Sequence, residues 1–443
     1  MRSNRSSETS RIGHRAVRLA VAASVTLWGG CGGTDVESQT EAFTSASSTL
    51  YDFDFDGELV TEAGWPSSIA IDNQLLYTVG QLNGVGGVGR LDATRLDSIS
   101  TESIGDGLVR VRYHATMPVA WPKSLGGSTP DGFVFRLPRN VSEAGLESFA
   151  TTHGGTCVDL WSAHDVGPAN MWYYYRPHAS GCAFEDGDVS ESVVSVALST
   201  QNSADSYPEL DAIWRDGVLN AVVVFGKDRV GATGFSDFGI AQYGQFNYRM
   251  RWTSFGDLKL MSTPADLPGA PDEKIPEVTW NGTFSDGRRI EVHAFIIDNP
   301  QLVTAEFEAR YATLSRTADI LVYNGHAALG ANVRAFARMG EPNPGQYTIV
   351  SMMGCDTFAY VDGFMAAQRS ALNADDPSGT KYLDMITNIV PTNPVVLSTA
   401  SLALIRGVAE PESPRSYLQI LREFEPTHHA VVTGDEDNEF RPD

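Results

Sequence analysis

A regular alternation of short apolar runs with helical patterns begins at Val218 and continues almost to the end of the 443-residue chain. The apolar runs are rich in β-branched residues and have the length of buried strands. They cover residues 220–225, 290–297, 319–323 and 347–353. Because strands that alternate with helices build a parallel sheet with both faces covered, this pattern predicts an α/β domain over residues 217–443.

The segments between and after these runs complete the expected domain. Apolar residues at helical spacing predict helices at 240–252, 302–314, 331–339, 361–372, 382–389 and 417–424. Further short strands are expected at 395–398 and 429–432. Right-handed crossovers bring the loops that follow parallel strands to one edge of the sheet, where ligands and catalytic groups collect.

The first half of the chain follows a different period. Val109, Val111, Tyr113 and Ala115 alternate with polar residues, as in a strand with one buried face. Similar runs, separated by glycine-rich turns, occur at 75–79, 133–137, 171–175 and 193–198. These runs predict a mostly antiparallel β domain over residues 51–216, followed by the α/β domain with its largely parallel sheet.

Residues 1–30 predict a secretory signal peptide. Five arginines precede a short apolar run at residues 19–28, which is too short to remain in a bilayer as a spanning helix. The segment Leu27-Trp28-Gly29-Gly30-Cys31 resembles a bacterial lipobox, which implies that Cys31 is acylated and becomes the new N-terminus. The alternative is an ordinary signal peptide followed by an incidental cysteine.

Residues 31–50 are polar, and their Ser and Thr content predicts a flexible tether. The expected location is therefore the bacterial cell envelope, on its periplasmic or surface side, with membrane contact only through the lipid. The formal net charge of −23 at pH 7 argues against nucleic acid as a partner, because an acidic surface repels phosphates.

Several short motifs are interpreted as structural. The spacing of His153, His164 and His178 fits no known metal-ligand pattern, so neither a metal nor a cofactor is expected. The tripeptide 237–239 spells the Asp-Phe-Gly of kinases without any other kinase element. The aromatic run at 172–175 is interpreted as a strand with one face in the core.

The remaining cysteines divide into a pair and a single residue. Cys157 and Cys182 lie in one glycine- and aromatic-rich region, and an oxidising compartment favours a disulfide between them. Cys355 is then left over. A leftover cysteine in an exported protein is either a reactive thiol or an inert buried side chain.

Two loops at the predicted sheet edge carry reactive side chains. One predicted strand ends in Gly325 and is followed by His326, and the other ends in Gly354 and is followed by Cys355. The two reactive residues are 29 positions apart, which is about one strand–helix–strand unit. Because strands connected in this way are usually neighbours about 5 Å apart, the spacing predicts an imidazole beside a thiol.

This proximity suits nucleophilic catalysis. A thiol is mostly protonated at neutral pH, and a neighbouring histidine raises its reactivity as a nucleophile. The same His326 can then protonate a leaving amine after Cys355 has attacked a carbonyl. The backbone N–H groups of Ala327 and Cys355 are the expected oxyanion hole.

The arrangement resembles the caspase-like (clan CD) cysteine peptidases, which include caspases, gingipains, legumains, separases and the bacterial CHAT proteins. The resemblance covers roughly residues 218–432 and rests on the two strand ends and on the motif Met353-Gly354-Cys355-Asp356-Thr357. It implies a caspase-hemoglobinase-like fold, His326 as general base and acid, and Cys355 as nucleophile. The residue after the histidine, usually Gly in these peptidases, is Ala327 here. If that position needs a positive φ, alanine strains the loop.

The sequence therefore predicts a cell-envelope cysteine hydrolase, namely a caspase-like peptidase that acts on a peptide or protein. Two alternatives stay open. One is a catalytically inactive surface lipoprotein that acts as a binding protein, and the other is a different cysteine-dependent amide hydrolase. The sequence indicates neither the substrate preference nor the oligomeric state.

Overall fold

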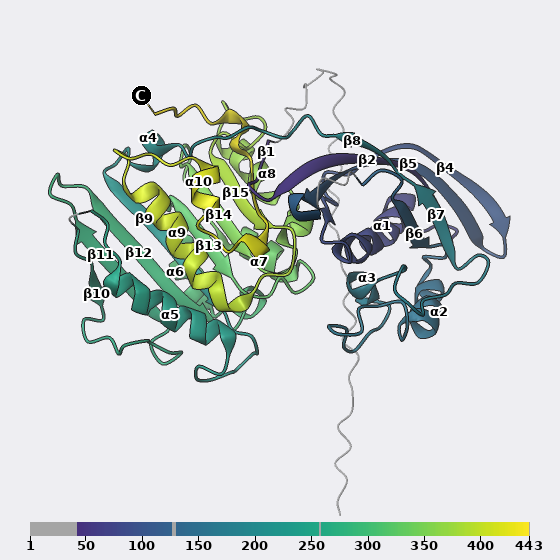
Figure 1. The fold of residues 1–443 in the computed structure, drawn as a ribbon, viewed down its shortest axis with the longest axis horizontal. Helices are drawn as coiled ribbons and strands as arrows, with labels where there is room; N and C mark the ends of the chain where they lie inside the picture. Colours follow the sequence, from purple (N-terminus) through teal and green to yellow (C-terminus); the bar gives the residue numbers. More distant parts are fainter. Residues whose placement is uncertain (1–41, 126–129, 257, 443) are drawn as a thin grey trace, which may run out of the picture. The chain divides into compact units, whose positions relative to one another are not determined.

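The computed structural model describes residues 42–125, 130–256 and 258–442 (Figure 1). The predicted signal peptide, Cys31 and residues 31–41 of the predicted tether lie outside these residues. For residues 42–50 the prediction of a flexible tether is wrong, because they form β1 (Phe43–Thr44) and the start of β2 (Ser48–Glu62) and are mostly buried in the sheets. Within the described part of the chain, no helix combines the length and the apolar character needed to cross a membrane.

The second half of the chain is built on a nine-stranded mixed sheet. Its five central strands are parallel, and antiparallel strands flank them at both ends. In spatial order, the sheet contains β1 (Phe43–Thr44), β16 (Ala430–Thr433), β15 (Leu383–Asn388), β14 (Thr348–Met353), β13 (Ile320–Asn324), β9 (Val218–Gly226), β12 (Arg289–Ile297), β11 (Glu277–Thr283) and β10 (Met261–Thr263). The expected α/β architecture with a largely parallel sheet is confirmed.

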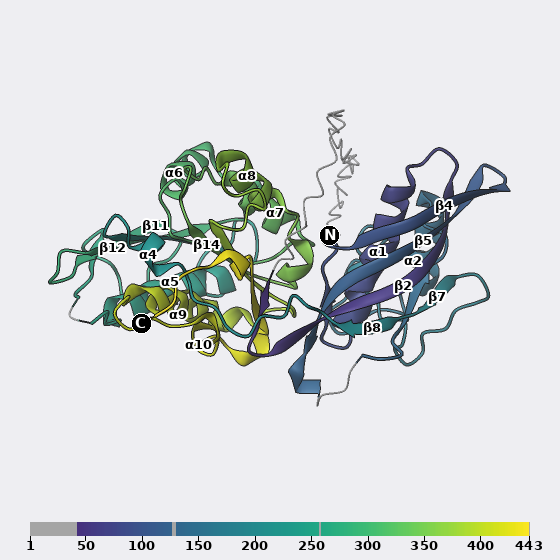
Figure 2. The same cartoon turned by 90° about the horizontal axis from the view of Figure 1, so that it is seen from above.

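Helices cover both faces of this sheet, as Figure 2 shows. One face carries α6 (Ala305–Ser315), α7 (Ala331–Met339) and α8 (Phe364–Leu372), and the other carries α5 (Phe238–Trp252), α9 (Leu397–Ala409) and α10 (Tyr417–Leu421). This double cover explains why Val222, Val223 and Val224 are consecutive and all at most 1% exposed. Burying each such side chain contributes about 1.5–3 kcal/mol.

The strand order reverses at β9. From this strand the chain continues through α5 to β12 on one side, whereas β13 lies on the other side. Connections that leave the two sides of such a point diverge, which opens a crevice at the carboxyl ends of the strands. The ends of β9 and β13 are therefore the expected place for a functional site.

Two predicted elements of this half are wrong. Residues 382–389 form strand β15 instead of a helix, because both faces of this segment are buried between β14 and β16. Residues 395–398 lie in helical turns instead of a strand. There the side chain of Asn393 accepts the N–H of Val395 at 3.2 Å, in a cap that starts the 3₁₀ turn Pro394–Val396.

The first half of the chain forms a five-stranded antiparallel sheet, as expected. Its centre is a 15-residue ladder between β2 (Ser48–Glu62) and β5 (Leu108–Pro122). The other strands are β3 (Val88–Gly89), β4 (Arg95–Gly105) and β8 (Ser195–Leu198), and a separate pair joins β6 (Val134–Pro138) to β7 (Val189–Val193). A Cβ atom at Gly57 would lie 2.1 Å from the ring of Tyr113, so glycine makes room for that buried side chain.

Helices replace two of the predicted strands in this half. Residues 75–79 belong to α1 (Ser67–Asn83), which buries Ile71, Leu75 and Val79 at helical spacing against the sheet. Residues 171–174 form the short helix α3 (Met171–Tyr174). The remaining helices are α2 (Glu143–His153) and α4 (Leu210–Ile213). In α1, tertiary burial outweighs the β-propensity of the apolar run.

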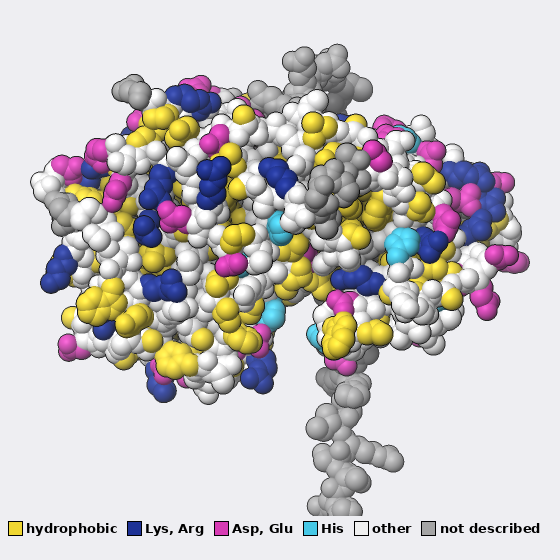
Figure 3. Space-filling model, in the orientation of Figure 1, with side chains coloured by type: hydrophobic (Ala, Val, Ile, Leu, Met, Phe, Trp, Pro, Cys, Tyr) yellow, Lys and Arg dark blue, Asp and Glu magenta, His cyan; other side chains and the backbone are white. Residues whose placement is uncertain are grey.

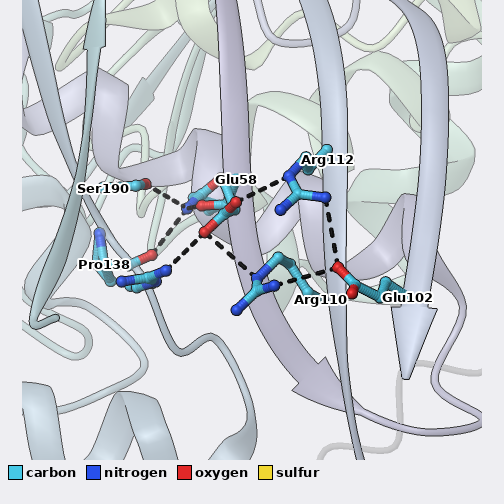
Figure 4. A network of polar contacts seen from close by, with 8 residues as sticks. Glu58, Glu102, Arg110, Arg112, Pro138 and Ser190 are labelled. Carbon is cyan, nitrogen blue, oxygen red and sulfur yellow. Dashed lines mark hydrogen bonds and ion pairs between the residues drawn. The ribbon is translucent and has the colours of Figure 1, made fainter. Parts of the chain in front are cut away.

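The outer face of the antiparallel sheet carries a charged network. Figure 3 shows basic and acidic side chains gathered over β4 and β5. In Figure 4, Arg110 and Arg112 lie between Glu58 and Glu102. Glu58 contacts the two arginines at 3.6 and 2.9 Å, and Glu102 contacts them from β4 at 3.1 and 3.4 Å. Exposed ion pairs contribute at most about 1 kcal/mol each. We interpret this network as a solvated sheet surface.

The predicted disulfide between Cys157 and Cys182 is confirmed. It closes a loop with a sequence separation of 25 residues, which contains helix α3. Loops of this length lose on the order of 3 kcal/mol of chain entropy in the unfolded state when they are cross-linked. The bond therefore stabilises the segment that carries the aromatic run.

Candidate active site

Three neighbouring parallel strands are each followed by an ionisable or nucleophilic side chain. Asp228 follows β9, His326 follows β13 and Cys355 follows β14. The register pairs Asn324 of β13 with Met353 of β14, and the N–H of Gly325 donates to the carbonyl of Met353 at 3.1 Å. The loops that carry the predicted dyad therefore leave adjacent strands at the same level of the sheet.

The two loops are packed backbone against backbone. A Cβ atom on Gly354 would lie 2.6 Å from the carbonyl oxygen of Gly325 and 3.2 Å from the nitrogen of Ala327. The first of these distances is too short for any side chain to be accepted without movement of the backbone. Glycine at position 354 therefore permits the close approach of the histidine loop to the cysteine loop.

The ring of His326 is fixed by a carboxylate. Its Nε2 atom lies 2.9 Å from Oδ1 of Asp228. Because an ionised carboxylate only accepts hydrogen bonds, Nε2 is the donor in this contact, and Nδ1 is the ring nitrogen that Asp228 does not contact. The carbonyl oxygen of His326 accepts hydrogen bonds from the Tyr323 hydroxyl at 2.9 Å and from Nδ2 of Asn332 at 2.8 Å. Both the backbone and the ring of this histidine are therefore held in place.

The loop that carries Asp228 is held in turn by Asp237. The Asp237 carboxylate accepts the backbone N–H groups of Asp228 and Arg229 at 3.1 and 3.0 Å. It also caps α5 by accepting the N–H of Ile240 at 3.1 Å. A Cβ atom on Gly239 would lie 2.1 Å from the carbonyl oxygen of Gly226. The tripeptide 237–239 therefore has the structural role of joining α5 to the end of β9.

Cys355 is the one cysteine in the described part of the chain that is not in a disulfide. The pKa of its thiol is raised to about 11, mainly by burial and also by the nearby Asp356 carboxylate, while a hydrogen bond with the Tyr173 hydroxyl acts in the opposite direction. Among the described residues, no hydrogen bond joins the sulfur to the His326 ring. The thiol is therefore protonated at neutral pH in this conformation.

Asp356 adds a buried carboxyl group beside the thiol. Its side chain is fully buried, and Nδ2 of Asn83 donates to its Oδ2 at 2.8 Å. Burial raises the pKa of Asp356 to about 7, although the Tyr173 hydroxyl and the Arg176 guanidinium act in the opposite direction. The backbone of Asp356 is left-handed, with φ at 53°.

The first half of the chain thus contributes to the surroundings of Cys355. Asn83 and Tyr173 contact the loop after β14, and the ring of Trp172 lies edge-on to Tyr360 at 6.4 Å between centroids. The sequence signal for this contact was the aromatic run at 172–175, which we interpreted as part of a strand. It is a helical turn that brings two aromatic side chains to the candidate site.

The loop after His326 is strained, but not at the predicted position. Ala327 does not have a positive φ, so alanine is tolerated there. The next three residues are left-handed instead, with φ of 48° at Ala328, 52° at Leu329 and 88° at Gly330. A left-handed non-glycine residue costs on the order of 1–3 kcal/mol, and such strain concentrates at functional sites.

Two backbone donors near the dyad have no acceptor. Within the described part of the chain, neither the N–H of Ala327 nor that of Cys355 donates a hydrogen bond. The carbonyl of Ala327, by contrast, accepts the N–H groups of Gly330 and Asn332 at 3.0 and 3.1 Å. Both N–H groups that the sequence analysis assigned to an oxyanion hole therefore lack a protein acceptor among the described residues, although Ala327 itself is only 1% exposed.

The third residue of the site, Asp228, was not identified from the sequence. The sequence signal for Asp228 is the same as for His326 and Cys355, because Asp228 closely follows the predicted strand 220–225. No group of three or more metal-binding side chains is found among the described residues. His153, His164 and His178 are not brought together as a metal site in this part of the chain.

Comparison with known proteins gives no further assignment. No protein-family model matches the chain, and no curated protein or solved structure matches it. The function is therefore argued from the residues at the sheet edge alone.

Proposed function

We propose that the protein is a cysteine hydrolase of the caspase-like type, which cleaves amide bonds in a peptide or protein. The observation that carries the proposal is the hydrogen bond from His326 to Asp228, formed at the edge where Cys355 follows the adjacent strand. A base oriented by a carboxylate beside a potential nucleophile is the arrangement that covalent catalysis requires.

In the proposed reaction, the sulfur of Cys355 attacks the carbonyl carbon of the substrate. The thiol proton passes to Nδ1 of His326, and the resulting imidazolium is stabilised by Asp228. The N–H groups of Ala327 and Cys355 donate to the oxyanion. The imidazolium then protonates the amine as the C–N bond breaks, which leaves a thioester that water hydrolyses with His326 acting again as a base.

The raised pKa of Cys355 constrains this mechanism. With a pKa of about 11, the thiol is not stored as a thiolate at neutral pH. Proton transfer to His326 therefore has to accompany the attack on the carbonyl. The reacting conformation brings Nδ1 of His326 toward the sulfur, since catalytic hydrogen bonds often tighten only in the substrate complex.

A binding protein without catalytic activity is the second candidate. It is favoured by one observation, which is that the thiol is largely buried and forms no hydrogen bond with the imidazole among the described residues. In that case the crevice at the strand ends would bind a partner without any reaction at Cys355 or proton transfer to His326.

We also propose that the protein acts in the bacterial cell envelope as a lipoprotein. The disulfide between Cys157 and Cys182 supports an oxidising compartment. Detergent-phase partitioning of cells that express the wild type and Cys31→Ser tests the anchor. Loss of membrane association in the variant is expected, and unchanged partitioning would exclude acylation at Cys31 as the anchor.

Hydrolysis of a mixture of unfolded proteins tests the catalytic proposal directly. New N-termini, identified by mass spectrometry, are expected with the wild type and are absent with Cys355→Ala and with His326→Ala. A Cys31→Ser variant is the matched control, because it removes a cysteine that the proposed reaction does not use. Equal cleavage by all four proteins, or none by the wild type, would favour the binding protein.

A further inference from the structure

A cavity of about 430 Å³ lies at the carboxyl end of β12, on the same sheet edge as the candidate site. Its volume falls in the range of sites that bind small molecules or side chains. The apolar part of its wall comes from Phe295, Ile297, Leu302, Val303 and Phe307. Leu302 belongs to the exposed part of this wall, with 58% of its surface accessible.

Charged residues form the rest of the wall, and acidic side chains predominate. Four carboxylates line the cavity together with two cations. Lys227 pairs with Asp298 at 2.8 Å, and Arg310 pairs with Glu277 at 2.9 Å. The other two carboxylates, those of Glu273 and Glu306, form no ion pair within the described part of the chain, although Glu273 accepts the N–H of Gly234 at 3.0 Å. The cavity thus has an excess of negative charge above an apolar wall.

This combination fits a long cationic side chain. The methylene groups of arginine or lysine lie well against apolar surface, while the charged end reaches polar groups at the rim. An acidic side chain would meet the same carboxylates at a repulsive distance. A purely apolar side chain would leave the carboxylates of Glu273 and Glu306 without a cationic partner.

The position of the cavity relative to Cys355 follows from the strand order. Three inter-strand steps, from β14 through β13 and β9 to β12, separate the cysteine strand from the cavity strand. At about 4.8 Å per step these span about 14 Å, and an extended peptide covers that distance with about four residues. Lys227 belongs to the cavity and directly precedes Asp228, so the cavity adjoins the loop that orients His326.

We propose that this cavity binds an arginine or lysine side chain of an extended peptide, about four residues from the bond that Cys355 attacks. The second part of this inference, the distance from the cavity to the scissile bond, rests on the proposed hydrolase function. The first part, recognition of a basic side chain by Glu273 and Glu306, is a binding property and can be measured without catalysis.

Fluorescence anisotropy with the full chain carrying Cys355→Ala tests the binding step. The probes are two fluorescein-labelled alanine–serine decapeptides that contain one leucine next to either arginine or citrulline, its uncharged analogue. We expect the arginine peptide to bind about three- to tenfold more tightly than the citrulline peptide, as is usual for two partly exposed ion pairs. Adding Glu273→Gln and Glu306→Gln should reduce this ratio to about one.

Two controls make the binding test specific. Glutamine at position 273 still accepts the N–H of Gly234, so the double variant retains that loop contact. Glu147→Gln removes an exposed carboxylate from α2, outside the cavity, and should leave the ratio unchanged. Equal binding of the two peptides to the parent protein, or a preference for arginine that survives in the double variant, would overturn the assignment.

Cleavage-site mapping with the active chain separates the two parts of the inference. Fragments are expected to have a basic residue about four positions from the cleaved bond, and this preference should be lost with Glu273→Gln and Glu306→Gln. Arginine-dependent binding without any cleavage would refute the hydrolase and leave the basic-residue site. Cleavage without a basic residue near that position would refute the site and leave the hydrolase.

Discussion

The Nε2 atom of His326 lies 2.9 Å from a carboxylate oxygen of Asp228, although 98 residues separate the two along the chain. The contact spans the point where the strand order of the central sheet reverses, between β9 and β13. It orients the imidazole and leaves its second nitrogen available, at the edge where Cys355 follows the next strand. The proposed chemistry depends on this relationship.

Replacing Asp228 by asparagine should impair catalysis without unfolding the protein. The amide can still accept from Nε2 of His326, but it no longer stabilises the imidazolium that forms during attack. We expect substrate turnover to fall by about 10- to 100-fold. Asp286→Asn is the matched control, because it removes a carboxylate that pairs with Arg288 between β11 and β12, outside both the candidate site and the cavity. Equal turnover in the wild type and Asp228→Asn would show that the hydrogen bond is only structural.

Gly239→Ala should destabilise the fold, because its Cβ atom would lie 2.1 Å from the carbonyl oxygen of Gly226. The expected loss is about 1–3 kcal/mol in the free energy of unfolding, measured by urea denaturation. Gly269→Ala serves as the control, since a Cβ atom at Gly269 meets nothing within 4 Å. Equal stability of the two variants would mean that the start of α5 is not held tightly against the end of β9.

Tyr173 tests whether the first half of the chain covers the thiol. Truncation to alanine removes a ring that contacts Cys355 and Asp356, so alkylation of the thiol by iodoacetamide should become about tenfold faster. Tyr173→Phe keeps the ring and removes only the hydroxyl, whose hydrogen bond lowers the pKa of Cys355. Its alkylation should therefore be no faster than that of the wild type. Acceleration in both variants would indicate that the hydroxyl, and not the ring, protects the thiol.

Asp319 should make stability depend on pH. Burial raises the pKa of this carboxyl from its ordinary value of 3.8 to about 8, so between these values the folded protein binds a proton that the unfolded chain has released. The resulting contribution to the free energy of unfolding is present at low pH and is lost as the pH rises to about 8, by at most about 1.4 kcal/mol per pH unit.

Asp319→Asn should remove this contribution and flatten the pH dependence between about pH 4 and pH 8. The asparagine oxygen can still accept the N–H of Asn220, which Asp319 accepts at 2.8 Å. Asp266→Asn, an exposed carboxyl in a loop, is the matched control and should leave the slope unchanged. Identical slopes in the wild type and Asp319→Asn would mean that the buried carboxyl stays ionised.

The alternation of strands and helices was predictable because its main signals are local. The run that became β9 consists of apolar β-branched residues, and α7 has the bounds expected from its spacing. The errors arose where tertiary burial outweighed a short pattern. Residues 382–389 have helical spacing but are buried on both faces as β15, and 75–79 have strand-like residues but pack along α1.

The candidate site was predictable only as far as strand ends can be read from the sequence. His326 and Cys355 each follow a glycine at the end of an apolar run, and Asp228 follows its strand in the same way. The role of Asp228 depends on the orientation of its loop, which is held by Asp237. The spacing of residues in the sequence does not indicate that orientation. The cover supplied by Tyr173 comes from more than 180 residues away in sequence, through packing that local patterns do not encode.

The rate of alkylation of Cys355 by iodoacetamide at pH 7, in the wild type and in His326→Ala, tests the central claim most directly. Peptide mapping by mass spectrometry distinguishes this thiol from Cys31. If His326 takes the proton of Cys355 as the sulfur attacks an electrophile, the wild type should react at least about tenfold faster than the variant. Equal rates in the two proteins would contradict the account, because the imidazole would then have no influence on the sulfur.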